Sequence, residues 1–149
     1  MNILIVVLLM LSTLVINAAI VTPKSITTIE KGIYSGIDYA TNTVIKSKED
    51  WDKLWKQHQT RNIPPEKSRV IDFDKDMVIV ATMGNKHTGG YEVKINGIEY
   101  NTDTGTMTVS VFHGVPNPDA IVTQGFTQPY HFVVVPKNDL KVRFMIATP

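Results

Sequence analysis

The sequence predicts a mainly β or α+β domain, built as a mostly antiparallel sheet or a β-sandwich with one amphipathic helix. Three observations predict this class: several short apolar strands between turn residues, a single segment of helical periodicity, and no repeated alternation of strand and helix. The helix is expected near the start of the mature chain. The chain has 149 residues, which suits one ordinary domain.

The N-terminal segment is typical of an export signal. An apolar run begins at Ile3 and leads into the small pair Ala18 and Ala19. We therefore expect residues 1–19 to be removed as a signal peptide and residues 20–149 to form a single exported domain, periplasmic, at the cell surface or secreted. If the segment is not cut, it is just long enough to anchor the protein in a bilayer. After cleavage we expect no membrane attachment.

The first strands and the helix follow this segment. Residues 25–47 mix β-branched residues with glycines, which predicts one or two strands. Ser47 is followed three residues later by Asp50, a pattern typical of a helix N-terminus. Four side chains then fall on one face at helical spacing: Trp51, Leu54, Trp55 and His58. We expect this face to pack on the sheet as core, and the alternative is an exposed aromatic binding surface.

The remaining strands lie in the second half of the chain. Residues 77–83 form a continuous apolar run, as expected of a central strand that is buried on both faces. Alternation resumes at Tyr91, and the turn cluster at residues 101–105 predicts a hairpin with a strand at residues 106–111. The last two strands are predicted at residues 132–135 and 142–146, with a turn between them.

Composition excludes several classes of function. The net charge of +1 gives no reason to expect nucleic acid as a partner. Cysteine is absent, which excludes a disulfide framework, a thiolate metal site and a cysteine nucleophile. No G-x-S-x-G motif is present, and none of the four histidines stands at a short metal-ligand spacing. We therefore expect no cofactor, no metal and no enzymatic activity.

Two polar loops supply the candidate partner-binding residues. The first is rich in glycine and connects two apolar strands: Asn85, Lys86, His87, Thr88, Gly89, Gly90 and Tyr91. The second is expected to be extended around an X-Pro bond: Thr123, Gln124, Gln128, Pro129 and Tyr130. Loops held by a stiff sheet can meet a protein partner at little ordering cost. Alternatively, the glycines only turn the chain and the two tyrosines begin core strands.

The same segments carry a family resemblance. Residues 88–91 read Thr-Gly-Gly-Tyr, residues 122–124 read Val-Thr-Gln, and residues 127–130 read Thr-Gln-Pro-Tyr. With the helix and its tryptophans upstream, this resembles the PrcB C-terminal domain family, named for a subunit of a bacterial surface protease complex, over about residues 44–144. The resemblance implies an exported accessory protein that associates with a protease and stabilises or regulates it. The founding type is a lipoprotein, and lipid anchoring is not carried over because cysteine is absent.

Two alternative functions remain open. Asn85, Thr88, Gly90 and Tyr91 are similar to the Asn-Pro-Thr-Thr-Gly-Tyr loop of chagasin-type inhibitors of cysteine proteases, which present loops from one end of an immunoglobulin-like sandwich. Lys86 replaces the proline, one residue is extra, and the Arg-Pro-Trp loop of those inhibitors is missing. The other alternative is a metal-dependent enzyme. It requires three histidines to meet at one point: His87, His113 and His131.

Overall fold

The computed structural model describes residues 26–149, so the expected signal peptide at residues 1–19 lies outside the described residues. Within the described range, no helix is long and apolar enough to cross a bilayer. The elements, in chain order, are β1 (Thr27–Gly32), β2 (Ala40–Ile45), α1 (Lys48–His58), the 3₁₀ helix η1 (Gln59–Arg61), β3 (Asp76–Met83), β4 (Lys86–Thr88), β5 (Glu92–Asn101), β6 (Thr106–Gly114), β7 (Gln124–Thr127), β8 (Tyr130–Pro136) and β9 (Lys141–Ala147).

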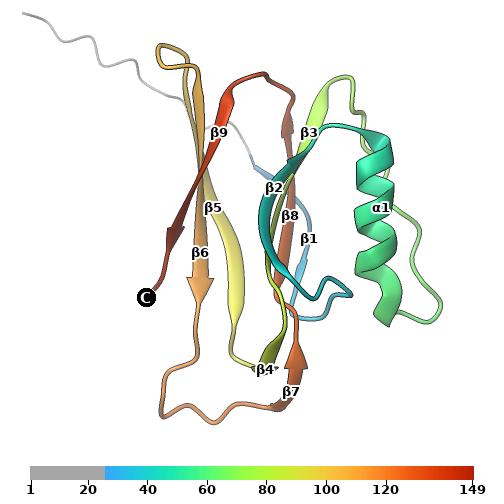
Figure 1. The fold of residues 1–149 in the computed structure, drawn as a ribbon, viewed down its shortest axis with the longest axis vertical. Coiled ribbons are helices and arrows are strands. Elements are labelled where there is room, and N and C mark those ends of the chain that lie inside the picture. The colour runs from blue at the N-terminus through green and yellow to red at the C-terminus, as the bar shows by residue number, and fades with distance from the viewer. Residues whose placement is uncertain (1–25) are drawn as a thin grey trace, which may run out of the picture.

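The elements form three layers (Figure 1). A four-stranded sheet in the order β1-β8-β3-β2 lies between the helix and a three-stranded sheet in the order β5-β6-β9. Strands β4 and β7 pair separately as a short ribbon at one end of the sandwich. Every strand pair is antiparallel except β6 and β9. The predicted class, a mostly antiparallel β-rich domain with one helix, is confirmed.

Strand β3 is the centre of the core because both of its faces are covered. Met77, Ile79 and Ala81 face the three-stranded sheet and belong to the larger apolar cluster. Val78 and Val80 face the helix and belong to a second cluster with its tryptophans. The continuous apolar run in the sequence therefore had the predicted cause, a strand buried on both sides.

The helix begins and packs as its sequence predicts. The Ser47 side chain accepts a hydrogen bond from the Asp50 backbone N–H, which caps the first turn. Trp51 and Trp55 are buried against the four-stranded sheet, and the Trp51 ring meets Phe132 edge to face at a centroid distance of 5.9 Å. The two tryptophans are core residues, and the alternative of an exposed aromatic surface on this face is wrong.

The pairing of the last strands differs from a simple hairpin. Strands β5 and β6 form the predicted hairpin, with a bulge between Ile95 and Gly97. The predicted strands at residues 132–135 and 142–146 both exist, but they lie in different sheets. After β8 the chain crosses to the other sheet, where β9 runs parallel to β6 because Val142 and Phe144 pack on the larger cluster.

His131 ties the two sheets together. It is buried on β8, and its Nδ1 accepts a hydrogen bond of 2.8 Å from the Ile95 backbone N–H at the bulge of β5. Its Nε2 lies 2.9 Å from the Thr28 hydroxyl of β1. Both ring nitrogens are therefore occupied inside the fold, and burial lowers the pKa of His131 to about 4.

Candidate protein-binding site

The fold brings the two predicted binding segments side by side. Strand β4 comes from the glycine-rich loop, β7 comes from the second segment, and the two pair antiparallel as the ribbon. The Gly89 backbone N–H donates to Thr123 O at 2.9 Å, and the Thr127 hydroxyl donates to Thr88 O at 2.9 Å. The loop between β3 and β5 therefore contains a short strand that its polar sequence did not predict.

The predicted residues differ in how far they reach the surface. Five of them are exposed: Asn85, His87, Gly90, Thr123 and Gln124. Three are partly exposed: Lys86, Thr88 and Tyr91. The Lys86 ammonium lies 5.3 Å from the centroid of the Tyr91 ring, so its charge rests on an aromatic face. Gly89 is buried, and a Cβ added there would lie 2.4 Å from the Thr123 hydroxyl oxygen.

Three residues of the second segment, Gln128, Pro129 and Tyr130, do not present the exposed side chains that we expected there. Gln128 and Tyr130 are each 6% exposed, and Pro129 is also buried. Gln128 Nε2 donates to Asn85 Oδ1 at 2.6 Å, while its Oε1 accepts from the Arg61 guanidinium. Gln128 is therefore a buried support of the ribbon. Tyr130 begins a core strand, as the alternative interpretation of the sequence proposed.

Gly90 has a backbone conformation that suits glycine alone. Its φ is +86°, in the left-handed region. A Cβ added there would lie 2.8 Å from Pro116 Cβ and 3.0 Å from Val122 Cγ1. Both the conformation and the close packing explain this glycine, which directs the chain from the ribbon into β5.

Some exposed side chains on and beside the ribbon were not among the predicted binding residues. Phe126 on β7 and Tyr34 are each 58% exposed. The His87 ring lies 5.1 Å from the Phe126 ring, and the Arg61 guanidinium lies 5.5 Å from the Tyr34 ring centroid. We call Tyr34, Arg61, Asn85, His87 and Phe126 the ribbon surface.

A hollow of about 410 Å³ lies within the ribbon surface. Its lining includes Arg61, Asn85 and Phe126, whereas Tyr34 lies outside the lining, against Arg61. Exposed aromatic rings beside an arginine are the composition typical of energetic centres in protein interfaces. Phe126 stands in the sequence between the predicted residues and was recognisable there. Tyr34 and Arg61 come from distant segments and carry no local signal.

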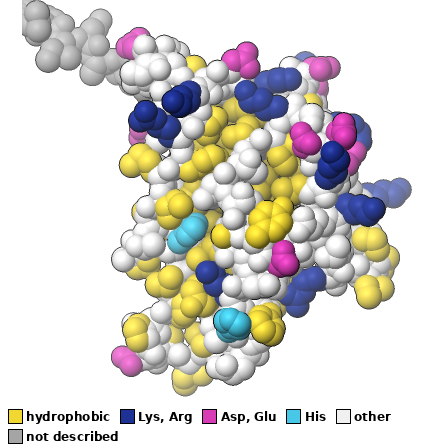
Figure 2. Space-filling view, in the orientation of Figure 1, with side chains coloured by type: hydrophobic (Ala, Val, Ile, Leu, Met, Phe, Trp, Pro, Cys, Tyr) yellow, Lys and Arg dark blue, Asp and Glu magenta, His cyan; other side chains and the backbone are white. Residues whose placement is uncertain are grey.

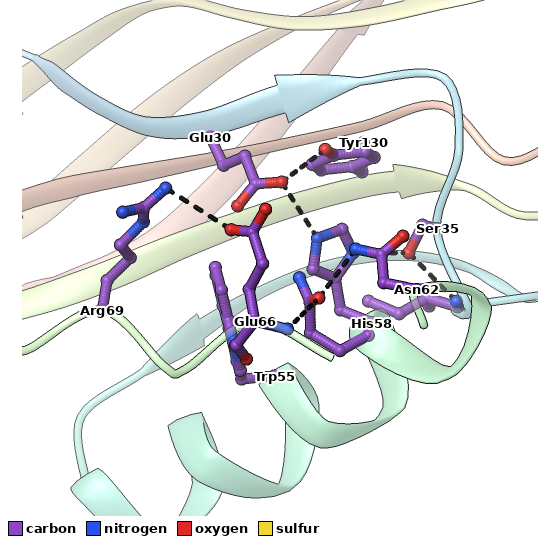
Figure 3. Close-up of polar contacts among 10 residues, drawn as sticks. Glu30, Ser35, Trp55, His58, Asn62, Glu66, Arg69 and Tyr130 are labelled. Atoms are coloured by element: carbon purple, nitrogen blue, oxygen red, sulfur yellow. Dashed lines mark hydrogen bonds and ion pairs between the residues drawn. The ribbon is translucent and has the colours of Figure 1, made fainter. Parts of the chain in front are cut away.

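A second polar cluster lies between the helix and the four-stranded sheet (Figure 3). His58 Nδ1 lies 2.9 Å from the Ser35 hydroxyl, and His58 Nε2 lies 3.2 Å from Glu30 Oε1. The Tyr130 hydroxyl donates to the same carboxylate oxygen at 2.8 Å. The cluster thus joins four parts of the fold: β1, the loop before β2, the end of α1 and the start of β8.

This cluster has the composition of a hydrolase triad, but its geometry is that of a structural network. Ser35 is 2% exposed, and its hydroxyl oxygen accepts from the Ile37 backbone N–H at 3.0 Å. Burial lowers the pKa of His58, which favours a neutral ring that donates through Nε2 to Glu30 and accepts from Ser35. Burial, together with the Glu30 carboxylate, raises the pKa of Tyr130. Because the Ser35 hydroxyl is enclosed and already hydrogen-bonded, we assign it a role in holding the helix on the sheet.

The three histidines of the metal-enzyme alternative occupy different settings. His131 is held in the core by Ile95 and Thr28, whereas His87 packs at a tilted angle against exposed Phe126. His113 lies on β6, and burial and the charge of nearby Lys86 lower its pKa. Within residues 26–149, no group of three histidine, aspartate, glutamate or cysteine side chains is arranged to hold a metal ion.

Part of the chain is similar to a known protein family. Residues 77–136 match the model of a family described as PrcB C-terminal. The match runs from β3 to β8 and includes the whole ribbon, so the resemblance seen in the sequence is confirmed over these residues. It does not reach α1, Tyr34 or Arg61. Comparisons with curated proteins and with solved structures find no match.

Proposed function

We propose that this chain is an exported accessory protein that binds a protease and stabilises or regulates it, with the ribbon surface as its contact. The family match supports a protease-associated protein. The contact rests on one observation: Phe126 and Tyr34 are both exposed, Phe126 lines the hollow, and Tyr34 lies against Arg61, which lines the same hollow. A partner that covers the hollow and the neighbouring Tyr34 removes both rings from water, which favours association because large aromatic side chains bury much apolar area with few rotatable bonds.

The ribbon is held firmly enough to present this surface. The Met83 backbone N–H donates to Pro129 O at 3.0 Å, and the Gln128 backbone N–H donates to Ile33 O at 2.8 Å. The buried Gln128 side chain holds Asn85 and Arg61 in place through its two hydrogen bonds. Because these supports are formed within the free chain, binding need not order the surface first, and less of the contact energy is lost.

The test compares the double variant Tyr34→Ala/Phe126→Ala with the wild-type chain in capture from the native exported fraction. We expect a protease, identified by mass spectrometry, to be captured by the wild type and its affinity to fall at least about tenfold in the double variant. The melting temperature should stay unchanged, since both side chains are largely exposed. Val70→Ala is the control, because Val70 is exposed and lies outside the ribbon surface. Equal capture of the protease by the double variant would exclude this contact.

Two further measurements test whether the chain is cleaved on export and whether it stabilises or inhibits the protease. The intact mass of the captured chain shows whether residues 1–19 have been removed, as export with cleavage requires. Adding the chain to the captured protease then separates a stabiliser, which prolongs the activity of the protease, from an inhibitor of the chagasin type, which lowers it at once.

A further inference from the structure

The sandwich is open along one flank. The four-stranded sheet faces a sheet of three strands, and β9 at the edge of the smaller sheet pairs only with β6 in the described chain. Lys46, which follows β2, donates to Asn138 O at 2.8 Å just before β9, so the edges formed by β2 and β9 lie on the same flank. Figure 2 shows apolar side chains exposed between the two sheets on this side of the molecule.

The open flank exposes side chains that face the core. On β9 these are Val142, Phe144 and Ile146, because their partners on β6 are the buried residues of that strand. Val142 and Phe144 are partly buried, but Ile146 is 54% exposed although it faces inward. When an inward-facing apolar side chain remains half exposed, the sheet lacks a neighbouring strand that would cover it.

A polar side chain on strand β2 also indicates that the space between the two sheets is not filled on this flank. Asn42 is paired with Ala81, whose side chain faces the larger cluster, so the Asn42 side chain also faces the gap between the sheets. Its Oδ1 is buried and has no hydrogen-bond partner within residues 26–149. A buried acceptor without a donor costs free energy, which an added segment in the gap would recover.

We propose that β9 receives an extended strand of a partner protein, which adds a fourth strand to the smaller sheet. The strand carries apolar residues at alternate positions, where they cover Ile146 and Phe144. Between them it carries acidic residues, because the outward face of β9 presents Lys141 and Arg143 in exposed positions.

A second copy of this chain fits this edge less well than an acidic strand. Antiparallel pairing of two β9 strands over their full length places Phe144 at the two-fold axis. Arg143 then lies diagonal to its own copy, within the reach of neighbouring cross-strand side chains, and like charges at that distance repel. Charge complementarity therefore selects an acidic, alternating partner strand. This edge is separate from the ribbon surface, so the inference does not depend on the proposed protease contact.

The test uses a seven-residue peptide with blocked ends in which four glutamates alternate with three valines. We expect it to bind the wild-type chain and to slow hydrogen exchange of β9 amides, as followed by NMR. A fully N-methylated copy cannot extend the hydrogen-bond ladder and should not bind. The matching lysine–valine peptide should bind at least about tenfold more weakly, since its charges repel Lys141 and Arg143.

Charge reversal in the protein supplies the decisive control. The double variant Lys141→Glu/Arg143→Glu changes two exposed side chains, so its fold should persist, and it should prefer the lysine–valine peptide. The proposal is overturned if the glutamate–valine peptide leaves the β9 amides unprotected, or if the double variant keeps the wild-type preference. It is also overturned if the chain dimerises through β9 without peptide, since the occupant is then a second copy.

Discussion

Replacing Trp51 by alanine tests the assignment of the helix face as core. The Trp51 side chain is 1% exposed, lies between Trp55 and Phe132, and donates through Nε1 to Arg69 O at 3.0 Å. Truncation of a buried tryptophan costs about 3–5 kcal/mol of unfolding free energy, through lost burial and the cavity that remains. For a domain of this size the melting temperature should fall by roughly 10–20 °C.

The assay is urea unfolding followed by circular dichroism and by the fluorescence of Trp55, the other of the two tryptophans. Trp51→Phe keeps an aromatic ring but removes the N–H donor to Arg69 O, so it should cost only about 1–2 kcal/mol. Lys53→Ala, on the exposed face of the same helix, should stay within about 0.5 kcal/mol of the wild type. A cost below about 1 kcal/mol for Trp51→Ala, together with loss of protease capture, would refute the reasoning and make the helix face the interface.

Two further predictions concern acid and the ribbon. Burial holds the pKa of His131 at about 4 and also lowers that of His58, so the unfolded chain takes up protons first as pH falls below about 6.5, and stability declines from there towards pH 4. Thermal unfolding should show a clearly lower melting temperature at about pH 4.5 than at pH 7, and equal values would contradict the buried, neutral state. Gly90→Ala should cost about 1–3 kcal/mol through its positive φ and the contact with Pro116, whereas Gly97→Ala, with open space around it, should change stability little in the same urea titration.

Local patterns were sufficient for most of the elements. The apolar run of β3, the alternation that resumes at Tyr91 and the cap at Ser47 each depend on neighbours within a few residues. The structure has a strand, a strand and a helix start there, although β5 begins one residue later, at Glu92. The position of β9 could not be read in this way. Its alternating pattern buries one face equally well in either sheet, and only the three-dimensional fit of Val142 and Phe144 to the larger cluster selects the pairing with β6.

The candidate site shows the same limit at the level of single side chains. Polarity suggested that Gln128 is exposed, yet it is buried because its amide satisfies both Asn85 and Arg61. Arg61 is separated from Gln128 by 67 positions in the chain, and Glu30 from Tyr130 by 100. Contacts over such distances leave no periodicity or spacing in a single sequence.

The family match covers the frame of the site, meaning the residues that hold the ribbon in place, and only part of the ribbon surface. The family match at residues 77–136 contains the positions that build the ribbon, such as Gly90 with its positive φ and the buried Gln128. Tyr34 and Arg61 lie outside the match, although Arg61 lines the same hollow as Phe126 and lies against the Tyr34 ring. A frame of this kind can be shared by proteins with different partners, because a change at the exposed flanking residues alters the contact without disturbing the buried supports. Recognition by this chain should therefore depend most on the aromatic and arginine side chains around the ribbon, and least on the buried residues that support it.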